Sequence, residues 1–137
     1  MKIRISMIFI LACLVTSIFF NIYQYKNKEV MDQHTAQIDS SYVIELSRSA
    51  VSIRDNDIEL ALEHALQADA LLKFTSYFAK NNIHVSYSSI LVTYLRNKVL
   101  KNEKIGNTND LFIALNELTK HPTSDEYIDK LIMVLQT

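Results

Sequence analysis

The feature that most constrains this chain is a long, mostly apolar segment, ISMIFILACLVTSIFFNIY, at residues 5–23. It contains no charged residue, no proline and no glycine. Because an α-helix rises about 1.5 Å per residue, a helix of this length just crosses the roughly 30 Å hydrocarbon core of a bilayer. A buried helix of a globular domain would normally carry a polar edge. We therefore predict a transmembrane signal-anchor helix over residues 5–25, preceded by a short cytoplasmic head at residues 1–4.

Two other interpretations of residues 1–28 remain open. A cleaved signal peptide would have a shorter apolar core ending in small residues of the Ala-x-Ala kind, whereas apolar side chains continue here as far as Ile22. The tetrapeptide ILAC at residues 10–13 resembles the lipobox of bacterial lipoproteins, which would make Cys13 a lipid-bearing N-terminus. That cysteine comes early for such a signal, and mostly apolar residues follow it.

Residues at the ends of the apolar segment indicate how it would sit in a membrane. Tyr23 and Tyr25 lie where amphipathic rings prefer the water interface. Basic residues flank the segment on both sides and nearly cancel the charge asymmetry that sets orientation. The short head favours a single-pass topology with the C-terminal domain outside the cytoplasm. The side chains expected to contact lipid are Ile5, Phe9, Leu14, Phe19, Phe20 and Tyr23.

The composition of residues 26–137 predicts one soluble all-α domain. Gly106 and Pro122 are the only glycine and proline, and a sheet protein of this size would need more such residues for its tight turns. The formal net charge of −1 provides no general excess of Lys and Arg, so we expect no nucleic acid partner. Cys13 is the only cysteine, which excludes a disulfide framework.

Apolar residues at spacings of three and four, interrupted by polar clusters, divide this domain into helices. The pattern breaks at residues 81–82, near Gly106 and at Pro122, and Thr123 with Glu126 has the spacing of a capping box. We predict a stalk and helix over residues 26–54, then helices at about 57–80, 83–103, 109–120 and 124–136. Because the connections are short, we expect a bundle of four or five antiparallel helices.

The start of the second of these helices carries two further signals. Asn56 is the expected N-cap, because Glu59 follows at capping-box spacing. Residues 57–66, DIELALEHAL, resemble the second helix of a tetratricopeptide repeat, which places small alanines where helices pack closely. No second copy occurs at the repeat period of about 34 residues, and a bundle helix with an alanine seam would have the same pattern.

Few residues in the chain have a pattern associated with a chemical site. The histidines lack the spacing of three or four that places two metal ligands on one helix face, so we expect no metal and no cofactor. Asp69 lies between Leu66 and Leu72 near an apolar face, so its carboxylate must be paired or be exposed by a modest rotation of that face, and a Tyr hydroxyl or a Lys is the expected partner. Lys98, Lys101, Lys104 and Lys120 fall in the last turns of predicted helices, as the helix dipole favours.

An aromatic group near the end of the helix at 57–80 is the best candidate for an interaction surface. It consists of Phe74, Tyr77 and Phe78, and aromatic residues are common at protein interfaces. Burial in a corner of the bundle is the alternative explanation for the same residues.

These observations predict a membrane-anchored, non-enzymatic interaction module that binds an unknown protein partner or a second copy of itself. The alternative is a membrane-tethered bundle that senses a small ligand held between its helices. A hydrolytic enzyme ranks third, because it would require a pocket that places Asp69 or Glu63 beside a histidine.

Overall fold

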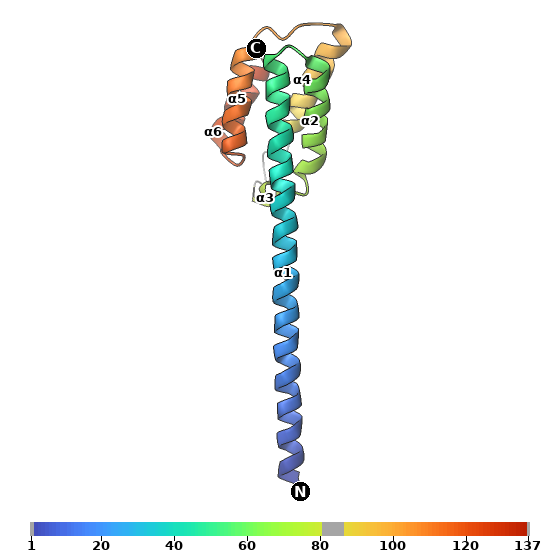
Figure 1. The fold of residues 1–137 in the computed structure, drawn as a ribbon. Helices are drawn as coiled ribbons and strands as arrows, with labels where there is room; N and C mark the ends of the chain where they lie inside the picture. The colour runs from blue at the N-terminus through green and yellow to red at the C-terminus, as the bar shows by residue number, and fades with distance from the viewer. Residues whose placement is uncertain (1, 81–86, 137) are drawn as a thin grey trace. The chain divides into compact units, whose positions relative to one another are not determined.

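In the computed structural model, residues 2–80 and 87–136 are described, with side chains described for residues 13–78 and 87–136. The helices are α1 (Lys2–Arg54), α2 (Ile58–Leu72), α3 (Ser76–Lys80), α4 (Tyr87–Lys101), α5 (Thr108–Lys120) and α6 (Asp125–Gln136) (Figure 1). The described residues form no strand, so the predicted all-α class is confirmed. The chain divides into two units, Met1–His34 and Thr35–Thr137.

The first unit contains the N-terminal part of α1, which continues through the stalk because no glycine or proline interrupts it. In the described part of the chain, no helix combines the length and apolar character needed to cross a membrane. The predicted lipid contacts Ile5 and Phe9 lie outside the residues with described side chains. The other predicted lipid contacts have exposed side chains: Leu14, Phe19, Phe20 and Tyr23.

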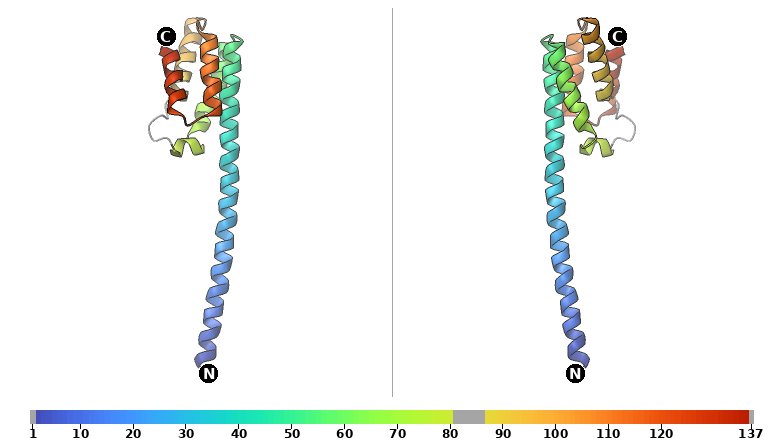
Figure 2. Two further views of the ribbon diagram at one scale, coloured as in Figure 1. Left: turned by 90° about the vertical axis from the view of Figure 1, so that its left-hand side faces the viewer. Right: turned by 90° about the vertical axis from the view of Figure 1, so that its right-hand side faces the viewer.

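The second unit is a helical bundle that includes the C-terminal part of α1. Its long helices alternate in direction along the chain, as the views in Figures 1 and 2 show. Helix α2 packs against α4, and α6 packs against both α4 and α5. The Ser49 hydroxyl donates a 2.9 Å hydrogen bond to the Ala61 carbonyl of α2, and the Arg54 guanidinium lies 5.2 Å from the centre of the Phe112 ring of α5. These contacts join α1 to the helices on both of its sides.

The bundle core is built from one face of each long helix. On α1 the buried residues Tyr42, Leu46, Ala50 and Ile53 recur at spacings of three and four, as expected for the apolar stripe of an amphipathic helix. On α2 the buried positions include the small residues Ala61, Ala65 and Ala68. The other core residues are Leu72, Tyr87, Leu91, Val92, Leu95, Ile105, Leu111, Ala114, Leu115, Leu118, Ile128, Leu131 and Leu135.

Two helices end in the same local motif, each at an asparagine with positive φ. Asn56 has a φ of 60° and Asn102 a φ of 52°. After α1, the Asn56 N–H donates to the Ile53 carbonyl and the Asp57 N–H to the Ser52 carbonyl, which is the hydrogen-bond pattern of a Schellman motif. The N-cap of α2 is therefore Asp57, whose Oδ1 accepts from the Leu60 N–H at 3.0 Å. Our prediction that Asn56 caps this helix was wrong by one residue.

The helix predicted over residues 57–80 is observed as two helices, α2 and α3. Thr75 lies at the break, where its hydroxyl donates to the Leu72 carbonyl at 2.6 Å and accepts from the Phe78 N–H at 3.2 Å. Asp39 of α1 also accepts hydrogen bonds from the backbone N–H and the hydroxyl of Ser76. These polar contacts stabilise the start of α3. The apolar pattern alone had predicted that α2 would continue through this point. The predicted start at residue 83 lies outside the described residues.

The packing predicts a large difference between two leucines of α4. Leu95 is 0% exposed and Leu100 is 76% exposed. We expect L95A to lower the free energy of unfolding by about 2–5 kcal/mol, because it removes buried methyl groups and leaves a cavity. The control L100A should change it by less than about 0.5 kcal/mol. Denaturant unfolding followed by circular dichroism measures both, and equal effects would contradict the assignment of Leu95 to the core.

Candidate functional site

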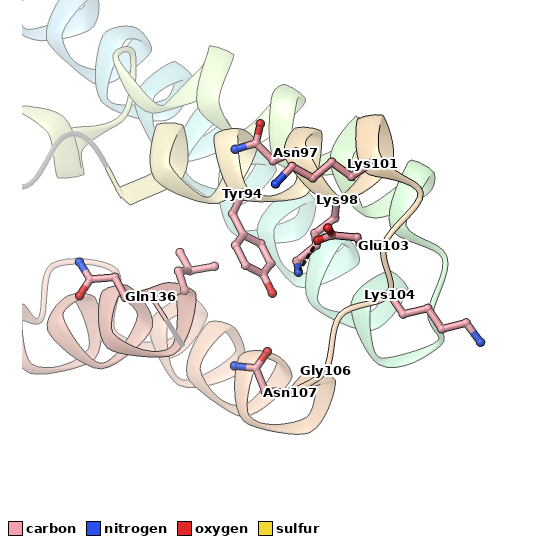
Figure 3. Close-up of a pocket in the computed structure, with 10 residues that line it drawn as sticks. Tyr94, Asn97, Lys98, Lys101, Glu103, Lys104, Gly106, Asn107 and Gln136 are labelled. Atoms are coloured by element: carbon pink, nitrogen blue, oxygen red, sulfur yellow. Dashed lines mark hydrogen bonds and ion pairs between the residues drawn. The ribbon is translucent and has the colours of Figure 1, made fainter.

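A cleft of about 600 Å³ lies where the end of α4, the loop to α5 and the end of α6 meet (Figure 3). Three of its lining residues are lysines and one is a glutamate, so its charged side chains carry a net positive charge. The lining residues are Tyr94, Asn97, Lys98 and Lys101 of α4, Glu103, Lys104, Gly106 and Asn107 of the loop, and Leu135 and Gln136 of α6.

The loop side of the cleft is shaped by the end of α4. The Asn102 N–H donates to the Val99 carbonyl and the Glu103 N–H to the Lys98 carbonyl, so α4 ends in a Schellman motif. This turn brings Glu103 back over the last turn of its own helix. There its Oε2 accepts a 3.1 Å hydrogen bond from Lys98 Nζ.

A hydrogen bond between two other elements fixes the opposite side of the cleft. Asn107, the residue before α5, donates from Nδ2 to the Val134 carbonyl of α6 at 3.0 Å. Asn107 and the neighbouring Gln136 both line the cleft (Figure 3). The start of α5 and the end of α6 are therefore held together where they form this wall.

The three lysines of the cleft have different surroundings. Lys98 pairs with Glu103, and its ammonium lies 5.6 Å from the centre of the Tyr94 ring. Lys101 extends beside Asn97, whereas the Lys104 ammonium points away from the other labelled residues (Figure 3). Within the described part of the chain, neither Lys101 nor Lys104 has an ion pair with a carboxylate. An anionic group in the cleft would thus meet at least one ammonium without a carboxylate partner.

A second, smaller hollow of about 370 Å³ continues the cleft along α4. The two share Tyr94, Asn97 and Leu135, and the smaller one adds Ile90 together with Ser89 and Thr93. The combined groove has lysines at one end and the apolar side chains of Ile90 and Leu135 at the other. Such a groove suits a molecule with one charged end and one apolar end.

The predicted aromatic group is divided between the surface and the interior. Phe74 is 62% exposed and Phe78 is 39% exposed, and the Lys73 ammonium lies 5.6 Å from the centre of the Phe74 ring. Tyr77 is instead partly buried, with its ring centre 6.0 Å from that of Tyr42. We call Phe74 and Phe78 the aromatic corner. Whether a partner binds there stays a prediction.

Asp69 of α2 belongs to a half-buried polar cluster at the contact between α2 and α4. Its Oδ1 accepts hydrogen bonds from the hydroxyls of Ser88, at 2.5 Å, and Ser89, at 2.9 Å. Our prediction of a Tyr or Lys partner was therefore wrong, although the carboxylate is satisfied. The hydroxyls of Tyr42 and Tyr87 are hydrogen-bonded to each other nearby. Every buried polar side-chain atom in the described residues has a partner, so this cluster is accounted for by packing.

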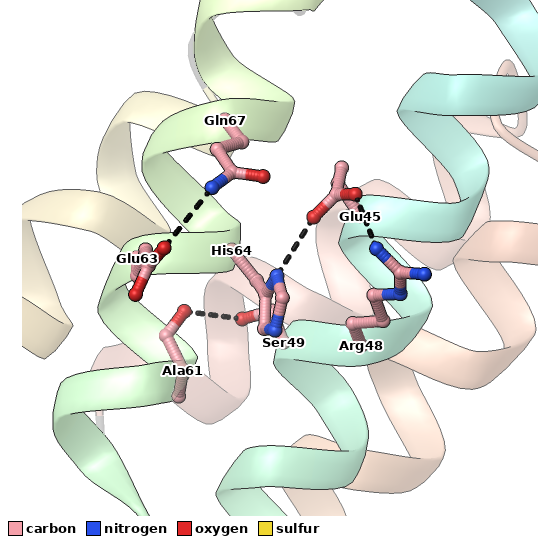
Figure 4. Close-up of polar contacts among 7 residues, drawn as sticks. All are labelled: Glu45, Arg48, Ser49, Ala61, Glu63, His64 and Gln67. Carbon is pink, nitrogen blue, oxygen red and sulfur yellow. Dashed lines mark hydrogen bonds and ion pairs between the residues drawn. The ribbon is translucent and has the colours of Figure 1, made fainter.

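Sequence reasoning missed a histidine–carboxylate pair between α1 and α2. His64 Nδ1 lies 2.7 Å from Glu45 Oε2, and Arg48 donates to Glu45 Oε1 at 2.9 Å (Figure 4). Glu63 interacts instead with Gln67. The side chains of His64 and Glu45 are only 16% and 13% exposed, so the pair contributes to the α1–α2 contact. No spacing rule could find it, because the two residues lie on different helices.

The described side chains contain no group of three histidines, cysteines or carboxylates that could hold a metal ion. Comparisons with family models, with curated proteins and with solved structures give no match to this chain. The resemblance of residues 57–66 to a tetratricopeptide helix therefore rests on those residues alone.

The buried tyrosines predict a loss of stability at high pH. Burial raises the pKa of Tyr42 well above its usual range and raises that of Tyr87 to about 12, compared with about 10 in an unfolded chain. Below about pH 10 both states are protonated, whereas above it the unfolded state ionises first. The free energy of unfolding should therefore fall between about pH 10 and 12, by on the order of 1 kcal/mol at about pH 11 for Tyr87 alone.

Urea unfolding at about pH 9 and 11 measures this effect. The double variant Y42F/Y87F should show a clearly smaller fall between the two pH values, because its core cannot ionise at these positions. An identical fall in both proteins would contradict the assignment.

Proposed function

We propose that this chain is a membrane-anchored, non-enzymatic helical interaction module that binds a partner protein or a second copy of itself at the membrane surface. The observation that carries this proposal is the aromatic corner. Phe74 and Phe78 leave much of their ring surface in water, although the adjacent bundle has a filled core. Exposed aromatic side chains are the kind of residue from which interaction hot spots are built.

The proposed anchor is the single-pass helix at residues 5–25, with the bundle outside the cytoplasm. Its support is the uncharged sequence of residues 5–23 and the exposure of the large apolar side chains that follow residue 13. Leu14, Ile18 and Phe19 are each more than half exposed. Lipid would cover such side chains and recover the free energy of removing them from water.

The anchor predicts a fractionation result. After expression with a C-terminal tag, the full chain should remain in the membrane pellet on alkaline carbonate washing. A variant lacking residues 2–25 should move to the supernatant. Protease added to intact cells should remove the tag from the full chain if the bundle lies outside. A full chain released by carbonate would overturn the anchor, and a protected tag would overturn the orientation.

The aromatic corner predicts the loss of a complex. Two differently tagged copies of the full chain, solubilised together from membranes, test self-association by co-purification, and mass spectrometry of the eluate tests for another protein. The double variant F74S/F78S should lower recovery of the bound species at least about tenfold, because hot-spot side chains each contribute about 1–2 kcal/mol.

The matched control is L100S, which removes one exposed apolar side chain from the end of α4. It should leave recovery unchanged. Unchanged recovery with F74S/F78S would remove the aromatic corner from the proposal, as would an equal loss with L100S. Melting curves from circular dichroism confirm that each variant is folded.

A second candidate function is a membrane-tethered bundle that senses a small ligand between its helices. The cleft between α4 and α6 supports it, because a concave site with both polar and apolar lining is what small molecules occupy. Binding at the aromatic corner and binding in the cleft involve different residues, so one does not require the other.

A further inference from the structure

We infer that the groove between α4 and α6 binds a small organic anion, a carboxylate carried on an apolar body. The carboxylate is received by Lys98 and Lys101, and the apolar body lies along Ile90, Tyr94 and Leu135. This inference rests on the second candidate function, that the bundle takes up a ligand. It is independent of the membrane anchor and of the aromatic corner.

The bundle already places a carboxylate at the charged end of the groove. Glu103 Oε2 lies 3.1 Å from Lys98 Nζ, within the cleft. The Glu103 side chain is 48% exposed, and exposed ion pairs of this kind contribute little to stability. A carboxylate from solution can therefore take the place of Glu103 without disturbing the fold.

Positive charge remains at this end of the groove when Glu103 is in place. Lys101 follows Lys98 by three residues on α4, so the two lie on the same face of that helix. Both line the cleft. Glu103 is already paired with Lys98, whereas Lys101 has no ion pair with a carboxylate in the described part of the chain. The excess positive charge favours an anionic ligand over a neutral one.

The groove extends beyond the lysines onto apolar side chains. The lysine-lined cleft and the smaller hollow share Tyr94, Asn97 and Leu135, so a ligand can extend from one into the other. Ile90 and Leu135 offer apolar surface beyond the lysines. An apolar body attached to the carboxylate would be removed from water there. Its burial makes the free energy of binding more favourable than that of an inorganic anion.

The experiment uses the full chain in nanodiscs of zwitterionic lipid, with methyl NMR of Ile90 and Leu135 as the readout. Phenylbutyrate is the anionic probe, and phenylbutanol is the neutral probe of similar shape. Titrations of empty nanodiscs correct for partition into lipid. Phenylbutyrate should shift both methyl signals in a saturable way and should bind at least about fivefold more tightly than phenylbutanol.

Charge variants then distinguish binding through the carboxylate from binding through the apolar part of the probe alone. K98Q should weaken phenylbutyrate binding about fivefold, whereas E103Q should strengthen it by a similar factor, because the competing carboxylate is gone. The matched control is E117Q, since Glu117 pairs with Lys120 at 2.8 Å in a similar local arrangement on α5. It should leave the affinity unchanged. A structural role for Glu103 alone would not increase affinity when the charge is removed.

The outcomes are distinguishable. Equal affinity for the two probes, or no strengthening in E103Q, would overturn the anionic ligand while leaving a ligand-binding bundle in place. Absence of saturable shifts with either probe would overturn both the anionic ligand and the second candidate function. Strengthening in E103Q together with weakening in K98Q supports the inference.

Discussion

One face of α1 carries the contacts that join this helix to α2, α3, α4 and α5. Its buried stripe supplies Tyr42, Leu46, Ala50 and Ile53 to the core. Polar contacts from the same segment reach α2 through Ser49 and α3 through Asp39. Most of these interactions join residues that are distant in sequence, so each closes a long loop and takes effect only when the bundle is assembled. The stripe on α1 therefore contributes contacts that the separate helices of Thr35–Thr137 could not make on their own.

The cleft shows how local backbone chemistry can create a binding surface. The Schellman motif at Asn102 directs Glu103 back toward Lys98, and the Asn107 hydrogen bond holds the start of α5 to the end of α6. Neither contact involves a buried charge. The cleft lies at the ends of α4 and α6, outside the core, where its side chains contact water. Its charges can therefore respond to a ligand without opening the core. In contrast, Asp69 already accepts two hydrogen bonds at Oδ1, from Ser88 and Ser89, which join α2 to α4.

Sequence patterns predicted the all-α class and most helix positions, because apolar spacing and polar breaks are local signals. They failed at the α2–α3 break, since Thr75 is not a strong breaker and its neighbour Ser76 is held by Asp39 of a different helix. The cleft could not be predicted, because it joins α4, the following loop and α6. The positions of its lysines were already explained by the helix dipole, so they did not indicate a cleft. Phe74 and Phe78 were found from their type and position, whereas Tyr77 was turned inward by contact with Tyr42.

The left-handed asparagines explain how a chain with one glycine can reverse direction so sharply. Asn56 and Asn102 adopt a backbone conformation in which glycine is the usual residue. Asparagine tolerates that conformation, yet it has fewer accessible backbone states than glycine when the chain is unfolded. The backbone at each of these two asparagines therefore loses less conformational entropy on folding than a glycine there would. At these two reversals asparagine thus combines a smaller loss of backbone entropy with the strain that a positive φ imposes on a residue with a side chain.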